Sequence, residues 1–356
     1  MAIYVTRPFV PKRTKVNSYL DTVFKNRQLS NNGPLVRELT SRLEEYLNVK
    51  NLILVANGTL ALHIAIKLFK LKGQVITTPF SFPATSSALV WEGCEPVYVD
   101  INRDSFNIDL SEKDLQIGAS AILATHVFGN PCNVNEINRL CLEHSIPAIF
   151  DAAHCFGVTM DGKSILSSGN ASVLSFHATK IFHTVEGGAL IINDSELYEE
   201  AKRIVNFGFN ERGSPQNLGI NAKMNEVEAA FGLANLDEID EIMGAYAKRY
   251  NVYDEHISEL FLRQEIASNC SHNHSYFPIV CPDEKIRERV LDCLAANEIY
   301  PRRYFSPSLD TVEIFNSSEN CPVSQDLSDR ILCLPIYYDL PIKTVLKISK
   351  LINSTV

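Results

Sequence analysis

The sequence predicts an α/β protein with a mainly parallel sheet in a large domain and a smaller α+β domain at the C-terminal end. The chain has 356 residues, 46% of them hydrophobic, which is enough for a sizeable core in one large and one smaller domain. Short apolar runs alternate with helical stretches between residues 52 and 193, and the pattern becomes almost wholly helical from residue 224 to about residue 261. We therefore place the large domain at residues 1–245 and the small domain at residues 246–356.

Seven short apolar runs are the candidate strands of the sheet. They are typical of strands buried on both faces of a parallel sheet. They lie at residues 52–56, 74–78, 95–99, 121–128, 147–152, 171–176 and 188–193. Amphipathic segments between them, such as 59–70 and 133–145, are predicted helices. Because ligands of such sheets bind at the carboxyl ends of the strands, the residues that follow each run are the candidates for a functional site.

The C-terminal part is predicted to begin with a long helix over 224–261 that leads out of the large domain. An extended run at 275–280, a helix at 284–297 and a final helix near 342–352 then form the small α+β domain. Residues 213–217 (GSPQN) are predicted to be an exposed loop.

Charge and composition exclude several classes of protein. Lys plus Arg number 33 against 42 Asp plus Glu, a net charge of −9, which argues against nucleic-acid binding through a basic surface. No apolar run is long enough to span a membrane, and the first residues contain no leader-like run. The nine cysteines are scattered without a CxxC pair, which indicates reduced thiols rather than a metal site. We expect a cytoplasmic protein that binds neither membrane, nucleic acid nor metal.

One motif suggests a nucleotide site, but its context argues against it. Residues 157–164 (GVTMDGKS) fit the phosphate-loop pattern G-x-x-x-x-G-K-S. A phosphate loop needs a strand directly before it and a helix directly after it. Here MDGK is predicted to be a tight turn between two extended pieces, and the next residues are not helical in pattern. The dinucleotide fingerprint G-x-G-x-x-G is absent as well.

Three other features follow strand ends. Gly58 and Thr59, after Asn57, begin a predicted helix whose free N–H groups can hold a phosphate. Asp151 ends an apolar strand, where a carboxylate is costly to bury without a cationic partner. Lys180 follows another strand and lies among apolar residues. Each has an ordinary alternative: a capped Asn-Gly turn, a turn-capping Asp and a solvated Lys. Together they supply what pyridoxal phosphate needs, namely a phosphate cradle, an acid for the ring nitrogen and a lysine for the imine.

The motifs SFHATK with EGGA, DAAH, NGT-AL, PFSFPAT and RILCLPIYYDL occur in order. On these motifs the chain, over about residues 5–341, resembles the sugar-nucleotide aminotransferases of the aspartate aminotransferase superfamily, which are fold type I pyridoxal phosphate enzymes. The resemblance implies an aspartate aminotransferase-like large domain, pyridoxal 5'-phosphate as cofactor, and a homodimer with composite active sites. Within the family, the chain is most similar to the branch that makes dTDP-4-amino-4,6-dideoxyglucose for O-antigen synthesis.

The resemblance assigns roles around the cofactor ring. It implies that Lys180 is the catalytic Schiff-base lysine and that Asp151 pairs with the ring nitrogen. Phe82 matches the aromatic residue that stacks on the ring face. His154 matches a residue, often Gln in the family, that contacts the ring hydroxyl.

The resemblance also assigns the phosphate contacts. Gly58, Thr59 and Ser175 match residues that bind the phosphate within one subunit. Asn221 matches an Asn that reaches the phosphate of the neighbouring subunit's cofactor. The chain has Asn-Ala-Lys-Met here in place of the usual Asn-Tyr-Arg-Met, so Lys223 stands where the family has Arg.

By resemblance, the expected reaction is transfer of an amino group from glutamate to C4 of a dTDP-4-keto-6-deoxyglucose substrate. The His-x-Thr-Lys motif that ends at Lys180, together with Glu186 before the glycine pair, resembles the 4-aminating branch of the family. Arg302 and Arg303 are candidates for binding the donor carboxylate, with a solvated pair as the alternative. Amination at C3 of the sugar, a cyclitol ketone as substrate, and a non-catalytic sensor with this fold stay open, although intact Lys180 and Asp151 favour an enzyme.

Overall fold

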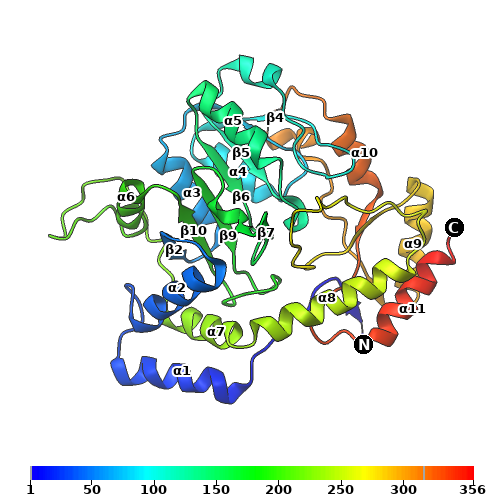
Figure 1. Cartoon of the computed structure of the whole chain (residues 1–356), viewed down its shortest axis with the longest axis horizontal. Helices are drawn as coiled ribbons and strands as arrows, with labels where there is room; N and C mark the ends of the chain where they lie inside the picture. Colours follow the sequence, from blue (N-terminus) through cyan, green and yellow to red (C-terminus); the bar gives the residue numbers. More distant parts are fainter. Residues whose placement is uncertain (1, 316) are drawn as a thin grey trace.

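The computed structural model describes residues 2–315 and 317–356, and its centre is a seven-stranded sheet in the order β2-β10-β9-β6-β5-β3-β4 (Figure 1). Its strands are β2 (Leu52–Val55), β3 (Gly73–Thr77), β4 (Cys94–Tyr98), β5 (Ile122–Thr125), β6 (Ala148–Asp151), β9 (Ala171–Ser175) and β10 (Gly188–Ile192). β10 runs antiparallel to β2 and β9, and the other neighbours are parallel. All seven predicted strands are present, and the mainly parallel sheet is confirmed.

The run at 121–128 is wrong as a single strand. β5 ends at Thr125, and residues Val127–Gly129 form a 3₁₀ turn with Phe128 at a φ of 57°. The buried Asn107 side chain accepts a hydrogen bond from the Val127 N–H at 3.0 Å, so a tertiary contact bends the chain away from the sheet. This bend brings residue 126 to the carboxyl end of the strand.

Helices cover both faces of the sheet. α3 (Gly58–Leu68), α4 (Pro83–Trp91) and α6 (Ser195–Val205) pack on one face, and α2 (Pro34–Leu47), α5 (Val134–His144) and α7 (Glu226–Leu236) pack on the other. The residues of β2 alternate accordingly. Ile53 and Val55 pack in the core on the side of α3, α4 and α6, whereas Leu52 and Leu54 pack in the core on the side of α2, α5 and α7. Burial on both faces explains why the strands read as unbroken apolar runs.

The predicted long helix over 224–261 is two helices, α7 and α8 (Ile239–His256). The break falls at Asp237 and Glu238, whose carboxylates face the first two helices of the chain. Lys15 of α1 (Arg13–Asn26) pairs with Glu238 at 3.0 Å, and Arg42 of α2 pairs with Asp237 at 2.8 Å. The helical pattern itself contains no such information, because the partners lie about two hundred positions earlier in the sequence.

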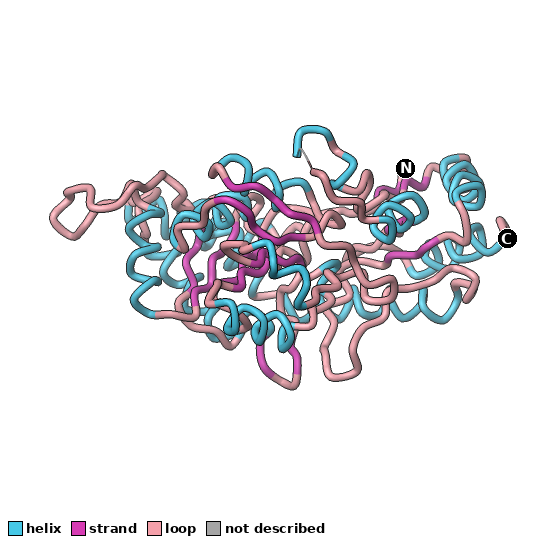
Figure 2. Tube along the Cα trace, turned by 90° about the horizontal axis from the view of Figure 1, so that it is seen from above, coloured by secondary structure: helices cyan, strands magenta, loops and turns pink. Residues whose placement is uncertain are grey.

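α8 leads into the C-terminal part, where β11 (Pro278–Val280) pairs antiparallel with β13 (Ile331–Cys333). The helices there are α9 (Glu284–Ala295), α10 (Pro322–Arg330) and α11 (Ile342–Asn353). β1 (Ile3–Tyr4) pairs with β12 (Ile299–Tyr300), and both termini lie at the same end of the molecule (Figures 1 and 2). The predicted boundary after residue 245 falls inside α8, and the division into two domains stays a prediction.

The segment that fits the phosphate-loop pattern is a small hairpin. β7 (Thr159–Met160) and β8 (Lys163–Ser164) pair antiparallel around a turn at Asp161 and Gly162. The prediction of a turn between extended pieces is confirmed. Only a three-residue 3₁₀ turn (Ile165–Ser167) follows it, so this segment has no α-helix N-terminus to offer a phosphate.

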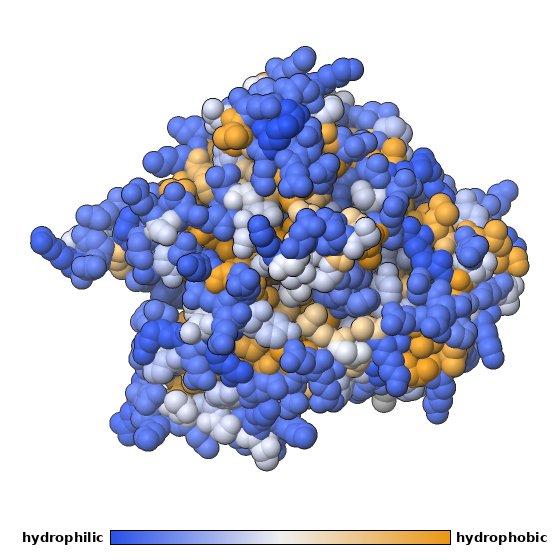
Figure 3. Space-filling view, in the orientation of Figure 1, coloured by the Kyte–Doolittle hydropathy of each residue, from blue (hydrophilic) through white to orange (hydrophobic). Residues whose placement is uncertain are grey.

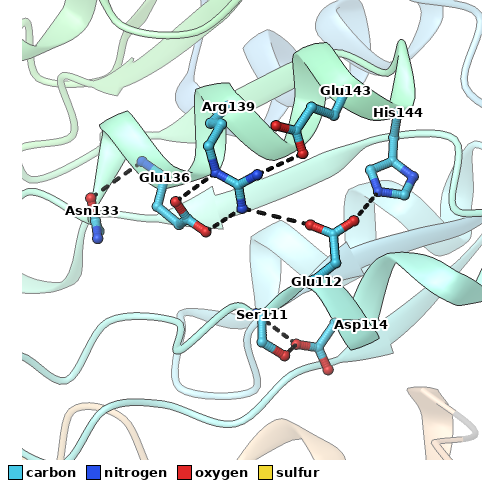
Figure 4. A network of polar contacts seen from close by, with 8 residues as sticks. All are labelled: Ser111, Glu112, Asp114, Asn133, Glu136, Arg139, Glu143 and His144. Carbon is cyan, nitrogen blue, oxygen red and sulfur yellow. Dashed lines mark hydrogen bonds and ion pairs between the residues drawn. The ribbon is translucent and has the colours of Figure 1, made fainter.

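Exposed ion pairs connect surface elements. In the network of Figure 4, Arg139 of α5 pairs with Glu136 and Glu143 of its own helix and reaches Glu112 at 3.6 Å, while His144 contacts Glu112 at 2.9 Å. Exposed pairs of this kind contribute about 1 kcal/mol or less each to the free energy of unfolding, so they add little to the stability of the fold.

The face in Figure 3 is mostly hydrophilic, with apolar groups in small separate areas. No helix in the described part of the chain is long and apolar enough to cross a membrane. All nine cysteines are free thiols, seven of them buried, as the scattered pattern predicts.

Candidate active site

A cavity of about 300 Å³ lies at the carboxyl ends of the parallel strands. It contains seven of the eight residues that the sequence assigns to the site: Gly58, Thr59, Phe82, Asp151, His154, Ser175 and Lys180. These residues follow four different strands of the sheet, so the tertiary fold brings them together as predicted.

The cradle for an anion is built from the start of α3. Asn57 caps this helix, because its side chain accepts the Leu60 N–H at 2.9 Å, and the helix begins at Gly58. A Cβ on Gly58 would lie 3.2 Å from Cβ of Ser175, and a Cβ on Gly188 would lie 2.7 Å from the Gly58 nitrogen. The glycines therefore let β9, β10 and the helix N-terminus approach closely, and a helix N-terminus favours a phosphate.

Asp151 is a buried acid at the end of β6. The Thr85 hydroxyl donates to Oδ2 at 2.6 Å, and the Ala153 N–H donates to Oδ1 at 3.1 Å. Burial raises the pKa of Asp151, and these two hydrogen bonds and the Lys180 charge oppose that rise. A buried carboxylate supported in this way suits a cationic N–H partner such as a protonated pyridine ring.

Lys180 lies in the turn after β9, with Nζ donating to the Tyr276 hydroxyl at 3.3 Å. Burial lowers the pKa of Lys180 to about 8, and the Asp151 carboxylate opposes that shift. A lysine with this pKa has a usable fraction of neutral amine near neutral pH, which is the nucleophilic form.

Two histidines in the cavity wall each have a buried ring nitrogen without a partner among the described residues. They are His154 at Nδ1 and His126 at Nε2. His126 Nδ1 accepts the Cys132 N–H at 3.0 Å, so its proton is on Nε2, and burial lowers its pKa to about 3. Such unpartnered polar atoms at a cavity fit a polar ligand, because a buried group without a partner is costly.

These features together fit pyridoxal phosphate. The α3 N-terminus offers a place for the phosphate, Asp151 a partner for the ring nitrogen, and Lys180 an amine for the aldehyde. Phe82 is 57% exposed and lines the cavity, where an aromatic ring is available for stacking.

Several cavity residues were not identified from the sequence: Ser81, Thr85, Thr125, His126, Tyr276, Tyr304 and Phe305. Thr85 lies within the PFSFPAT motif, and Tyr276 lies in the predicted extended run at 275–280, but neither has a local pattern that indicates its partner. Of the two candidate arginines, Arg302 lines the cavity. Arg303 instead contacts the Ser328 carbonyl and Asp329.

Asn221 is not in the cavity of its own chain. It lies between α6 and α7 and pairs with Asn206, and the loop between these two paired residues projects from the left side of the molecule in Figure 1. Lys223 donates to the Asn206 side chain at 2.8 Å and lies 4.7 Å from the centre of the Phe207 ring. The predicted contact of Asn221 with a neighbouring subunit stays a prediction.

The fold and this site define a pyridoxal phosphate-dependent aminotransferase. The sequence profile of the DegT/DnrJ/EryC1/StrS aminotransferase family matches residues 12–353, and the chain belongs to this family. It is therefore a sugar-nucleotide aminotransferase that uses pyridoxal phosphate.

Relatives of known sequence and structure are similar to this chain over nearly its whole length. Two dTDP-4-amino-4,6-dideoxy-D-glucose transaminases are each 37% identical, one from Shigella dysenteriae over 95% of both chains and one from Escherichia coli over 98% of both. The crystal structure of DesI in the presence of its TDP-sugar product superposes with a TM-score of 0.93 at 32% identity, covering 99% of this chain and 92% of that one.

Proposed function

We propose that this protein converts dTDP-4-keto-6-deoxy-D-glucose into dTDP-4-amino-4,6-dideoxy-D-glucose, with glutamate as amino donor, for O-antigen sugar biosynthesis. The observation that carries the reaction type is Lys180 and Asp151 together in one cavity beside an anion cradle. The 37% identity to two transaminases named for this product supports the choice of substrate.

Bound pyridoxal phosphate supplies an electron sink, and the chain's residues do the rest. Lys180 would hold the cofactor through its side-chain amine, and the free amine would carry the donor's α-proton as base and then as acid, a role suited to its pKa of about 8. Asp151 would hold the proton on the ring nitrogen. The α3 N-terminus would hold the phosphate. Ping-pong kinetics are expected, because the amino group would stay on the enzyme between release of the first product and binding of the keto sugar.

Three side chains beside Lys180 support amination at C4. His177, Thr179 and Glu186 line the same cavity, with His177 Nδ1 2.8 Å from the Thr179 hydroxyl and Nε2 3.6 Å from Glu186. Their size and hydrogen bonds shape the space in which the sugar must present its carbonyl. Because rotating the ring by one carbon would present C3, this wall is where we expect regiochemistry to be decided.

The donor and the oligomer are further parts of the proposal. Arg302 lines the cavity with its guanidinium 3.3 Å from the Tyr304 hydroxyl, a suitable cation for a glutamate carboxylate. A homodimer with shared sites is supported by the projecting segment around Asn221, which exposes the apolar side chains Phe207, Phe209, Leu218 and Ile220.

Product analysis by NMR after incubation with dTDP-4-keto-6-deoxy-D-glucose and glutamate tests the substrate and the position. We expect nitrogen on C4, equatorial in the gluco configuration. Nitrogen on C3 would overturn the regiochemistry, and an axial amine on C4 would overturn only the gluco assignment. Glutamate should also change the cofactor spectrum; an unchanged spectrum would indicate a non-catalytic sensor.

A further inference from the structure

Three side chains from distant segments form a hydrogen-bonded chain in the cavity wall. Lys180 Nζ donates to the Tyr276 hydroxyl at 3.3 Å, and that hydroxyl lies 3.2 Å from His154 Nε2. The Tyr276 and His154 rings are 4.5 Å apart, and both residues are buried. Tyr276 enters from the segment before β11, so the C-terminal part of the chain completes a site built on the sheet.

The direction of each hydrogen bond follows from the protons available. Burial holds the pKa of Tyr276 well above its ordinary value and that of His154 well below, so both rings are neutral. The Tyr276 hydroxyl oxygen accepts a hydrogen bond from Lys180 Nζ, so the single hydroxyl proton of Tyr276 can be donated to His154 Nε2. Nε2 must then carry a lone pair, which places the ring proton on Nδ1. Nδ1 is buried without a partner among the described residues.

We propose that Tyr276 is a positioning residue that holds the Lys180 amine in place and fixes His154 in the tautomer with its proton on Nδ1, as a hydrogen-bond donor to the cofactor. The phenolic oxygen of pyridoxal phosphate can accept a hydrogen bond, and His154 Nδ1 has no such acceptor among the described residues. The inference concerns the cofactor site alone, so it does not depend on which sugar is the substrate.

NMR of the cofactor-free protein tests the tautomer without any change in the chain. The ring nitrogens of the histidines are isotope-labelled, and the His154 signals are assigned by their loss in His154→Gln. We expect the proton of His154 on Nδ1, and a mixture of tautomers in Tyr276→Phe. A proton on Nε2 in the unsubstituted protein would overturn the proposal.

Labelling of Lys180 tests the positioning. Trace acylation of the cofactor-free protein at several pH values, followed by mass spectrometry of the Lys180 peptide, reports the midpoint at which the amine becomes reactive. In Tyr276→Phe the midpoint should fall by about one pH unit, because the lost acceptor stabilises the ammonium form. The affinity of this variant for pyridoxal phosphate should also fall several-fold.

Tyr253→Phe is the matched control. Tyr253 is also buried and donates to the Pro335 carbonyl at 2.9 Å, so this substitution likewise removes one buried hydroxyl. Its Lys180 midpoint should equal that of the unsubstituted protein. An unmoved midpoint in Tyr276→Phe, or the same shift in both variants, would overturn the positioning role.

Discussion

The hydroxyl of Thr85 lies 2.6 Å from Oδ2 of Asp151, so helix α4 fixes the acid at the end of strand β6. Behind this contact the Ser81 hydroxyl lies 2.9 Å from those of both Thr85 and Thr125. All these side chains are buried. A neutral chain of hydroxyls therefore supports the buried Asp151 carboxylate.

Thr85→Val should lower kcat/KM by about ten- to a hundredfold, because a hydrogen bond to a charged group is lost while the shape is kept. The Thr85 bond opposes the rise that burial causes in the Asp151 pKa, so its loss raises that pKa further. The acidic limb of the pH profile of kcat/KM should move to higher pH. Thr85→Ser keeps the hydroxyl donor, so the acidic limb of its pH profile should stay where it is in the unsubstituted enzyme. If the acidic limb lay at the same pH in the Val and Ser variants, the role of the hydroxyl would be contradicted.

Lys180→Ala should abolish turnover and covalent attachment of the cofactor while leaving the fold intact. The reason is that the amine faces a cavity rather than packing in the core. Borohydride treatment and mass spectrometry should locate the cofactor on Lys180 in the unsubstituted protein, and circular dichroism checks the fold. The control Lys67→Ala removes an exposed lysine paired with Glu92 and should leave turnover unchanged. Near-normal turnover in Lys180→Ala would remove it from the catalytic role.

Asp151→Asn should lower kcat by several powers of ten with pyridoxal phosphate still bound. A neutral amide cannot stabilise the protonated ring nitrogen, whereas the phosphate cradle at Gly58 and Ser175 is untouched. Steady-state kinetics and the cofactor content after dialysis measure the two effects separately. Activity close to that of the unsubstituted enzyme would show that another group partners the ring.

Covalent attachment of pyridoxal phosphate to the cofactor-free protein should depend on pH through Lys180. Burial lowers its pKa to about 8, and the neutral amine is the attacking form. The rate should therefore rise about tenfold per pH unit below that value and level off above it. Stopped-flow absorbance measures the rate. A midpoint near the ordinary lysine value of about 10.4 would contradict the effect of burial.

The active unit should be a homodimer in sedimentation at assay concentrations. Asn221 is exposed and lies outside the cavity of its own chain, where it pairs with Asn206 at the base of the loop between α6 and α7. Asn221→Ala should weaken pyridoxal phosphate binding several-fold in the dimer, because we expect the Asn221 side chain to bind the phosphate of the cofactor in the partner subunit. A fully active monomer would rule out shared sites.

Local patterns were sufficient for much of the fold. The strands buried on both faces are recognisable as apolar runs, because each residue of such a strand lies in one of two cores. The helix break at Asp237 was not predicted, because residues 233–243 contain no glycine or proline to mark a helix end, and the partners of Asp237 and Glu238 lie far away in α1 and α2. The end of β5 at Thr125 likewise depends on Asn107.

The sequence by itself predicted which groups would meet in one site: Lys180, Asp151 and the Gly58 turn each lie at or after a strand end, and strand ends of a parallel sheet converge. Only the tertiary structure decided what surrounds them. Thr85 reaches Asp151 from α4, and Tyr276 reaches Lys180 from a segment 96 positions further along the chain. Such partners have no sequence signal, because a hydrogen bond depends on distance in space and not on spacing along the chain.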